Sequence, residues 1–327
     1  MRDKMKVLIT HPIPPEGLAA LRERYDVLYP AGRGPYTAEE MLSLLPECDA
    51  VLACGAVTRG QIEAAPRLRV ISNYGAGYDQ VDVDAADERG VIVTNIPDST
   101  TESTAELAFA LLVSVYRRVA ELDAMLRAGP PENAFGMGRH MGHNLNGATL
   151  GIVGMGRIGR RLAGMARAFG MDVVYHNRRR LAPDLEAGAR WLSLDELLKQ
   201  SDAVSINCPL TPETRGLIGA REIGLMKEDA VLINTSRGGT VDYDALCDAL
   251  EAGRLRGAGL DVFPDEPRVP KRLLALSCVT LTPHVGTNTH EARKGMAEAC
   301  AARIIDALEG RTPPNMVNRH LAMKKPQ

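Results

Sequence analysis

The segment Thr149-Leu150-Gly151-Ile152-Val153-Gly154-Met155-Gly156-Arg157-Ile158-Gly159 joins an apolar run to three glycines in G-x-G-x-x-G spacing, and a helical pattern follows it. In such a strand–turn–helix, the first glycine permits a tight turn, the second lets the backbone approach a pyrophosphate, and the third lets helix and strand pack closely. The helix N-terminus then favours the anion. The stretch therefore predicts a dinucleotide-binding βαβ unit in the middle of the chain. Its expected cofactor contacts are Gly154, Gly156, Arg157, Ile158 and Gly159.

Strand and helix patterns alternate on both sides of this segment, which predicts an α/β fold with two doubly wound parallel-sheet domains. In the second series, strands are expected near 149–153, 172–175, 203–207, 230–234, 257–261 and 278–282. In the first hundred residues, strands are expected at Val7–Thr10, Val51–Ala53, Val70–Ser72 and Val91–Thr94, and helices at Pro14–Arg24, Ala38–Leu45 and Gln61–Ala65.

Two long helical patterns flank the second series. One starts at the capping-box sequence Ser99-Thr100-Thr101-Glu102 and runs to about Arg127, and the other covers Glu291–Glu309. We interpret them as the passages out of a first domain and back into it. The predicted substrate domain is therefore discontinuous, comprising residues 1–101 and 292–327, and the dinucleotide-binding domain comprises residues 102–291.

Composition narrows the class of protein. Lys and Arg number 39 against 41 Asp and Glu, so the net charge of −2 gives no basic field for nucleic acid. The six cysteines are scattered without metal-ligand spacing, which predicts buried thiols, a reducing compartment and no metal site. The N-terminus carries no secretory pattern, and the longest apolar stretch, Leu107–Tyr116, is too short to span a bilayer. We expect a cytoplasmic protein without a membrane or nucleic-acid partner.

The residues after the second predicted strand indicate which dinucleotide binds. NAD-binding folds place Asp or Glu there to hold the ribose, whereas this chain has Asn177 followed by Arg178 and Arg179. A carboxylate would repel a 2′-phosphate, while guanidinium groups bind it through charge-assisted hydrogen bonds. The pattern favours NADPH, with NAD as the alternative cofactor. The three arginines Arg178–Arg180 could instead form a solvated loop.

Three segments that follow later strands carry reactive side chains: Asn234–Gly239 with Arg237, Asp261–Pro267 with Glu266, and Pro283-His284. Arg237 suits a substrate carboxylate, and His284 suits proton donation to a carbonyl oxygen with Glu266 on its other ring nitrogen. Singly, Arg237 could be a surface ion pair, Glu266 a cap and His284 a loop histidine. Together, at the carboxyl ends of strands in one sheet, they predict reduction of a 2-keto acid.

These motifs, with Gly151–Gly159 and Asn207-Cys208-Pro209-Leu210-Thr211, resemble the D-isomer-specific 2-hydroxyacid dehydrogenase family over nearly the whole chain. The resemblance implies a Rossmann cofactor domain and a flavodoxin-like substrate domain. It implies that Arg237 binds substrate, that Glu266 and His284 form the acid–base pair, and that Asp261 holds the nicotinamide carboxamide. Further cofactor contacts would be Thr104, Cys208, Pro209, Thr214, Thr235, Ser236 and Gly286. The loop Gly75-Ala76-Gly77 would bind the substrate carboxylate through its N–H groups, although a tight glycine turn needs the same residues.

Within the family, the asparagine–arginine pair and His290–Met296 are similar to NADPH-using glyoxylate, hydroxypyruvate and 2-ketogluconate reductases. One departure concerns the linker Ala128–Asn146, where many members carry a tryptophan near the substrate. This linker has Phe135, Met137, His140, Met141 and His143, and the only tryptophan of the chain is Trp191.

The alternatives are a D-3-phosphoglycerate dehydrogenase-like enzyme and a dinucleotide-sensing protein like the carboxyl-terminal-binding-protein corepressors. The chain lacks the extra C-terminal domain of longer phosphoglycerate dehydrogenases, and Asn177 with its arginines does not suit NAD. The expected partners are a small 2-keto or 2-hydroxy acid and a second copy of the chain. By resemblance, the long helix from Glu102 and the loop after it would form the homodimer contact.

Overall fold

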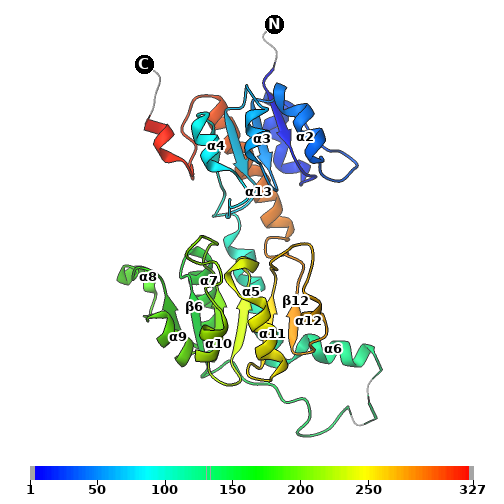
Figure 1. Ribbon diagram of the computed structural model, residues 1–327, viewed down its shortest axis with the longest axis vertical. Helices are drawn as coiled ribbons and strands as arrows, with labels where there is room; N and C mark the ends of the chain where they lie inside the picture. Colours follow the sequence, from blue (N-terminus) through cyan, green and yellow to red (C-terminus); the bar gives the residue numbers. More distant parts are fainter. Residues whose placement is uncertain (1–3, 130, 133, 324–327) are drawn as a thin grey trace. The chain divides into compact units, whose positions relative to one another are not determined.

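The computed structural model describes residues 4–129, 131–132 and 134–323, and the chain divides into two compact units (Figure 1). The terminal unit comprises Met1–Thr100 and Asn288–Gln327, and the central unit comprises Thr101–Thr287. Residues 1–3, 130, 133 and 324–327, which belong to the predicted domain ranges or linker, lie outside the described residues. Each unit contains one parallel sheet with helices, which confirms the predicted fold class.

The terminal unit is built on a five-stranded parallel sheet in the order β2-β1-β3-β4-β5. This 2-1-3-4-5 order is that of flavodoxin-like folds. Strands β3 and β4 are buried along their whole length, as expected when both faces of a sheet are covered. The strands are β1 (Lys6–Ile9), β2 (Asp26–Leu28), β3 (Ala50–Ala53), β4 (Val70–Asn73) and β5 (Ile92–Thr94).

Alternating side chains of these strands enter two separate cores. Val7 and Ile9 pack with the long helix α13 (His290–Leu308), and Leu8 packs in the second core. The helical segments of the terminal unit are η1 (Pro15–Leu18), α1 (Ala19–Arg24), α2 (Ala38–Leu44), η2 (Leu45–Glu47), α3 (Arg59–Glu63), α4 (Val83–Glu88), α13 and η4 (Arg319–Met323).

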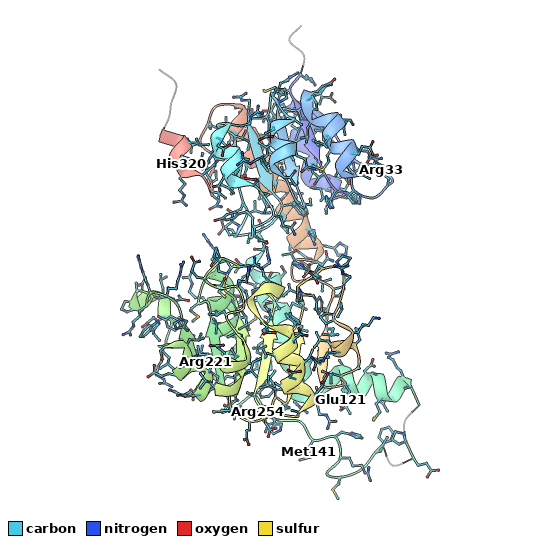
Figure 2. The ribbon with its side chains drawn as sticks, in the orientation of Figure 1. Arg33, Glu121, Met141, Arg221, Arg254 and His320 are labelled. Atoms are coloured by element: carbon cyan, nitrogen blue, oxygen red, sulfur yellow. The ribbon has the colours of Figure 1, made fainter. Side chains whose placement is uncertain are left out.

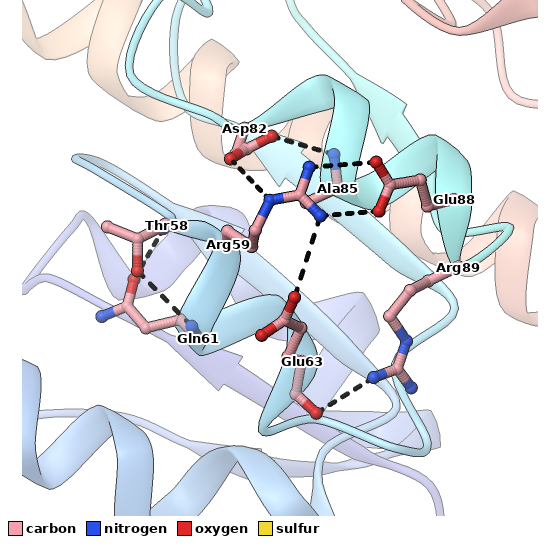
Figure 3. Close-up of polar contacts among 8 residues, drawn as sticks. All are labelled: Thr58, Arg59, Gln61, Glu63, Asp82, Ala85, Glu88 and Arg89. Carbon is pink, nitrogen blue, oxygen red and sulfur yellow. Dashed lines mark hydrogen bonds and ion pairs between the residues drawn. The ribbon is translucent and has the colours of Figure 1, made fainter.

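Helices α3 and α4 are joined by Arg59 (Figure 3). Its guanidinium donates to both carboxylate oxygens of Glu88 at 2.6 and 3.1 Å and lies 3.8 Å from Asp82. Asp82 also caps α4 by accepting from Ala85 N, and Thr58 caps α3 in a reciprocal capping box. Because the Arg59–Glu88 pair is solvent-exposed, it contributes little to stability, and its role is to orient α3 against α4.

The central unit is built on a seven-stranded parallel sheet in the order β12-β11-β10-β9-β6-β7-β8. The order reverses between β6 and β9, so the carboxyl ends of these two strands form the switch point where doubly wound sheets bind ligands. The strands are β6 (Thr149–Val153), β7 (Asp172–His176), β8 (Arg190–Trp191), β9 (Ala203–Ile206), β10 (Val231–Asn234), β11 (Gly257–Leu260) and β12 (Val279–Leu281).

Helices cover both faces of this sheet, with one core around Leu246 and Ile223 and another around Leu112 and Leu162. Its helical segments are α5 (Thr101–Arg117), α6 (Val119–Arg127), α7 (Arg157–Ala168), α8 (Pro183–Glu186), α9 (Leu194–Gln200), α10 (Ala220–Leu225), η3 (Gly238–Thr240), α11 (Tyr243–Glu251) and α12 (Lys271–Leu274).

The prediction of one helix from Glu102 to Arg127 was wrong. Arg118 adopts left-handed angles (φ 57°, ψ 32°) and separates α5 from α6, while its guanidinium bonds both carboxylate oxygens of Glu121. The carboxylate of Glu102, expected in a capping box, receives hydrogen bonds from Arg161 of α7. The apolar periodicity continues across Arg118, so the break leaves no mark in the pattern.

No helix in the described part of the chain is both long and apolar enough to cross a membrane. The segment after α13, which the sequence analysis assigns to the substrate domain, packs in the terminal unit. Met316 bridges to Thr94, and the buried Asn318 bonds Val93 N, Val91 O and Asp87.

Candidate active site

The turn between β6 and α7 holds the three glycines at the sheet's switch point. A Cβ on Gly154 (φ +100°) would lie 2.6 Å from the backbone nitrogen of Cys208, so only glycine lets this turn meet the loop after β9. A Cβ on Gly159 would lie 2.5 Å from the Gly154 carbonyl, whereas one on Gly156 would meet open space. Gly156 caps α7 without a side chain, and no acidic residue stands in the first helical turn. The N-terminus of α7 thus offers donors to an anion.

Two buried oxygens at this edge have no hydrogen-bond partner among the described residues. They are Oδ1 of Asn207 and Oγ1 of Thr235, which directly follow the neighbouring strands β9 and β10. Unsatisfied buried polar atoms are rare, and a bound ligand is one way to satisfy them. The donors of α7, the open side of Gly156 and these two atoms fit a bound dinucleotide.

The loop after β9 holds the residues expected on the adenosine side. Burial raises the pKa of the Cys208 thiol to about 11, and Cys208 packs against the core around Leu246. Thr214 folds the loop back by donating to Pro209 O and accepting from Thr211 N at 2.7 Å. Thr214 therefore shapes the loop, while Pro209 is exposed.

The three arginines in the turn after β7 differ in their ion pairs. Asn177 accepts a 2.7 Å hydrogen bond from Met155 N and so joins this turn to the glycine turn. Arg178 and Arg179 are exposed and form no ion pair within the described residues. Arg180 is bound by Glu186 through two hydrogen bonds of 2.7 and 3.0 Å. Arg180 is nonetheless 64% exposed, so the alternative of a solvated arginine loop stays open.

Arg237 stands in a turn organised by the fully buried Asn234. The Asn234 amide donates to Arg237 O, and its oxygen accepts from the backbone nitrogen and hydroxyl of Ser236. Arg237 O also accepts from Thr240, and the Arg237 guanidinium bonds Ser236 O at 2.8 Å. Hydrogen bonds from the buried side chains of Asn234 and Thr240 thus fix the backbone that carries Arg237.

Gly238 brings the Arg237 turn against the loop that carries Glu266. A Cβ there would lie 2.1 Å from the carbonyl carbon of Phe263, so only glycine permits this backbone contact. Tyr243 of α11 ties the same loop down by donating to Val262 O. Two segments separated by more than twenty residues thus lie side by side.

His284 and Glu266 form a close pair. His284 Nδ1 lies 2.6 Å from Glu266 Oε2, and Glu266 Oε1 accepts from Phe263 N at 2.9 Å. An ionised carboxylate only accepts, so Nδ1 carries the proton in this pair and Nε2 faces away from Glu266. His284 is 47% exposed, which leaves its ring accessible to a substrate.

Asp261, 1% exposed, holds the backbone on which His284 sits. Its carboxylate accepts from Thr282 Oγ1 (2.6 Å), Val285 N (2.8 Å) and Gly286 N (2.9 Å). His284 itself adopts left-handed angles (φ 53°), an uncommon state for a non-glycine residue that persists where surrounding contacts fix it. The predicted contact of Asp261 with a carboxamide stays a prediction, and these three bonds add a structural role.

Thr104 lies beside the same loop. It is buried on α5 and donates to Gly286 O at 3.3 Å. The central unit thus gathers Arg237, Glu266, His284 and most of the expected cofactor residues at the carboxyl edge of its sheet.

The loop Gly75-Ala76-Gly77 lies in the terminal unit, after β4. Asn73 donates to the carbonyls of Gly75 and Gly77, and Asn95 donates to that of Ala76. With its carbonyls held this way, the loop has amide N–H groups at Ala76 and Gly77 that meet no acceptor among the described residues. These two N–H groups are available to an anion, and both the anion nest and the plain tight turn stay open.

Sequence reasoning gave no role to Asn234, Asn73 or Asn95. Each is an amide side chain at or just beyond a strand's carboxyl end, where it bonds backbone groups of the following turn. An asparagine after a buried strand was the only available signal.

A cavity of about 290 Å³ in the central unit contains none of the predicted site residues. It is lined by residues before β11 and β12 and by the end of α5, at the amino edge of the sheet. Figure 2 labels Glu121 and Met141 there. No cluster of three or more potential metal ligands occurs in the described ranges.

Comparison with known proteins agrees with this geometry. Residues 109–286 match the model of the D-isomer specific 2-hydroxyacid dehydrogenase NAD-binding domain. The chain is 44% identical over 331 residues to a glyoxylate reductase of Thermococcus litoralis, covering 99% of each chain.

Two solved structures extend the likeness. A glyoxylate reductase from Paecilomyes thermophila gives a TM-score of 0.88 at 35% identity, over 98% of this chain and 100% of the other. An NADPH-dependent glyoxylate/hydroxypyruvate reductase from Sinorhizobium meliloti, solved with NADP and malonate, gives 0.85 at 30% identity over 97% of each. The chain therefore belongs to the D-isomer specific 2-hydroxyacid dehydrogenase family.

Proposed function

We propose that the protein reduces a small 2-keto acid of the glyoxylate or hydroxypyruvate type to the D-2-hydroxy acid, with NADPH as the preferred cofactor. The observation that carries the proposal is the His284–Glu266 pair beside the Arg237 turn in the unit that bears the glycine turn. The reductases of Thermococcus litoralis and Sinorhizobium meliloti support the same substrate class.

The reduced nicotinamide, when bound, supplies hydride to the carbonyl carbon. Arg237 pairs with the substrate carboxylate and polarises the carbonyl. His284 donates the Nε2 proton to the carbonyl oxygen, while Glu266 holds Nδ1 and stabilises the imidazolium before transfer. Binding of a carboxylate by the N–H groups of the Gly75-Ala76-Gly77 loop, which lies in the terminal unit, stays a prediction.

The preference for NADPH rests on Arg178 and Arg179, exposed and without an ion-pair partner within the described residues. Their guanidinium groups supply the charge that a 2′-phosphate needs, and Asn177 adds none that would repel it. NAD remains the alternative cofactor, for which this turn offers no carboxylate.

A second copy of the chain is the proposed macromolecular partner. The segment after α6 exposes Phe135 (85%) and Met141 (69%), apolar side chains that association would bury. We propose that the enzyme is cytoplasmic. Light scattering after size-exclusion chromatography is expected to give the mass of a dimer. A monomer at micromolar concentration would remove this part of the proposal.

The experiment is a spectrophotometric panel that follows oxidation of NADPH and NADH with glyoxylate, hydroxypyruvate, pyruvate, 2-ketogluconate and phenylglyoxylate. We expect turnover of the smallest acids and a higher kcat/KM with NADPH. No turnover of any keto acid, with either cofactor bound, would favour a dinucleotide-sensing protein instead. Turnover with NADH alone would remove the NADPH assignment but keep the reductase.

A further inference from the structure

Trp191, the only tryptophan of the chain, lies on the edge strand β8 beside the arginine turn. It pairs with Tyr175 of β7, so its strand ends one residue before the carboxyl end of β7. Its indole N–H donates a 3.1 Å hydrogen bond to the carbonyl of Asn177. The side chain is 38% exposed, so this bond, rather than deep burial, fixes its position.

Asn177 is therefore held at two points. Its side-chain oxygen accepts from Met155 N in the glycine turn, and its backbone carbonyl accepts from Trp191. The preceding residue is held as well, because His176 Nδ1 bonds Leu192 O at 3.0 Å. The chain thus enters the arginine turn from a fixed backbone.

The other end of the turn is also fixed. Arg180 binds Glu186, Glu186 accepts from the hydroxyl of the buried Tyr175, and that hydroxyl accepts from Leu181 N. The hydrogen bonds at Asn177 and at Arg180 thus fix the chain on both sides of Arg178 and Arg179, the two arginines available to a ligand.

We propose that Trp191 is a positioning residue for recognition of a 2′-phosphate, acting through its hydrogen bond to Asn177 O to hold Arg178 and Arg179 in place. This inference rests on the proposed NADPH-binding function. Exposed arginines have large rotamer entropy, and a backbone fixed on both sides reduces the ordering that binding requires. Loss of the Trp191 bond should therefore weaken binding of the 2′-phosphate and leave the rest of the dinucleotide unaffected.

The test is calorimetric titration with two probes that lack nicotinamide: 2′,5′-ADP, which carries the 2′-phosphate, and 5′-AMP, which does not. The variants are Trp191→Phe, which keeps an aromatic ring but removes the donor, and Phe169→Leu, which alters another half-exposed aromatic of the same unit. We expect wild type to bind 2′,5′-ADP more tightly than 5′-AMP. Trp191→Phe should weaken 2′,5′-ADP roughly three- to tenfold, the effect of losing one neutral hydrogen bond, and leave 5′-AMP unchanged.

The outcomes separate the two claims. If wild type fails to prefer 2′,5′-ADP, the NADPH assignment itself is wrong. If wild type prefers it and Trp191→Phe keeps that preference in full, the assignment stands and the role of Trp191 is wrong. Equal losses with both probes, or the same loss in Phe169→Leu, also overturn the inference.

A second measurement needs no variant at Trp191. Tryptophan emission of the wild-type protein reports on Trp191 alone, so 2′,5′-ADP should change it at saturation and 5′-AMP should change it much less. Identical emission changes with both probes would contradict the proposal even where Trp191→Phe fails to fold.

Discussion

The two ligand-facing regions of the central unit are built differently. In the catalytic region, Arg237 and His284 stand on backbone held by fully buried polar side chains, Asn234 and Asp261. In the arginine turn, Arg178 and Arg179 are exposed, and their anchors lie at the edge of the sheet. Chemistry needs side chains placed to fractions of an ångström, whereas recognition of a phosphate tolerates looser placement.

The difference predicts two classes of variant. Changes in the catalytic region should lower kcat or stability, and changes in the arginine turn should shift the balance between two cofactors.

The largest effect is expected from His284→Ala. Removing a general acid costs typically 10²- to 10⁴-fold in rate, so kcat should fall by about that factor while NADPH binding, measured by calorimetry, stays intact. The matched control is His320→Ala, an exposed histidine outside the predicted site. Near-normal turnover of the His284 variant would remove His284 as proton donor.

Asp261→Asn should damage both stability and rate. The new amide cannot accept from all three donors that the buried carboxylate now serves, so we expect a loss of about 1–3 kcal/mol in the free energy of unfolding. Because His284 shares that loop, kcat should fall as well. Urea denaturation and steady-state kinetics measure the two effects. An unchanged unfolding midpoint would show that the three bonds do not hold the loop.

Arg178→Asp combined with Arg179→Ala should act on one cofactor only. Charge-assisted hydrogen bonds contribute about 1.5–3 kcal/mol each, so we expect the KM for NADPH to rise roughly tenfold or more, with kcat and the KM for NADH nearly unchanged. Kinetics with both cofactors at saturating keto acid decide the matter. Equal effects on the two KM values would place the arginines outside the 2′-phosphate site.

The smallest effect concerns the anchor at Arg180. The Arg180 guanidinium, with the Tyr175 hydroxyl, lowers the pKa of Glu186 to about 2. A carboxyl whose folded pKa is depressed stabilises the fold above its unfolded pKa, and that stabilisation is lost as pH falls through the folded value. The stability difference between wild type and Glu186→Gln should therefore shrink as pH falls from about 4.5 towards 2. A constant difference across that range would show that the pair does not couple to folding.

The contrast also explains what the sequence could predict. Glycine spacing and apolar strand runs identify both sheets, because parallel strands buried on both faces leave a strong pattern. The short edge strands β2 and β8 were missed, because they contain no buried residue and so leave no apolar pattern.

In the site, too, the sequence reveals some residues and not others. Arg237, Glu266 and His284 could be proposed because each follows a predicted strand in the same sheet. The residues that hold their backbone, Asn234 and Asp261, could not be proposed from the sequence. Their hydrogen bonds to Arg237 and Val285 depend on how each turn folds back onto the end of its strand. The ion pair of Arg180 with Glu186 spans only six residues, but three consecutive arginines give no sign of which one is bound.

We propose that this chain makes a D-2-hydroxy acid from a 2-keto acid. The most direct test is to incubate the protein with NADPH and hydroxypyruvate and to resolve the enantiomers of the product by chiral chromatography. We expect D-glycerate, with one molecule formed for each NADPH oxidised. L-glycerate, or a racemic product, would contradict it.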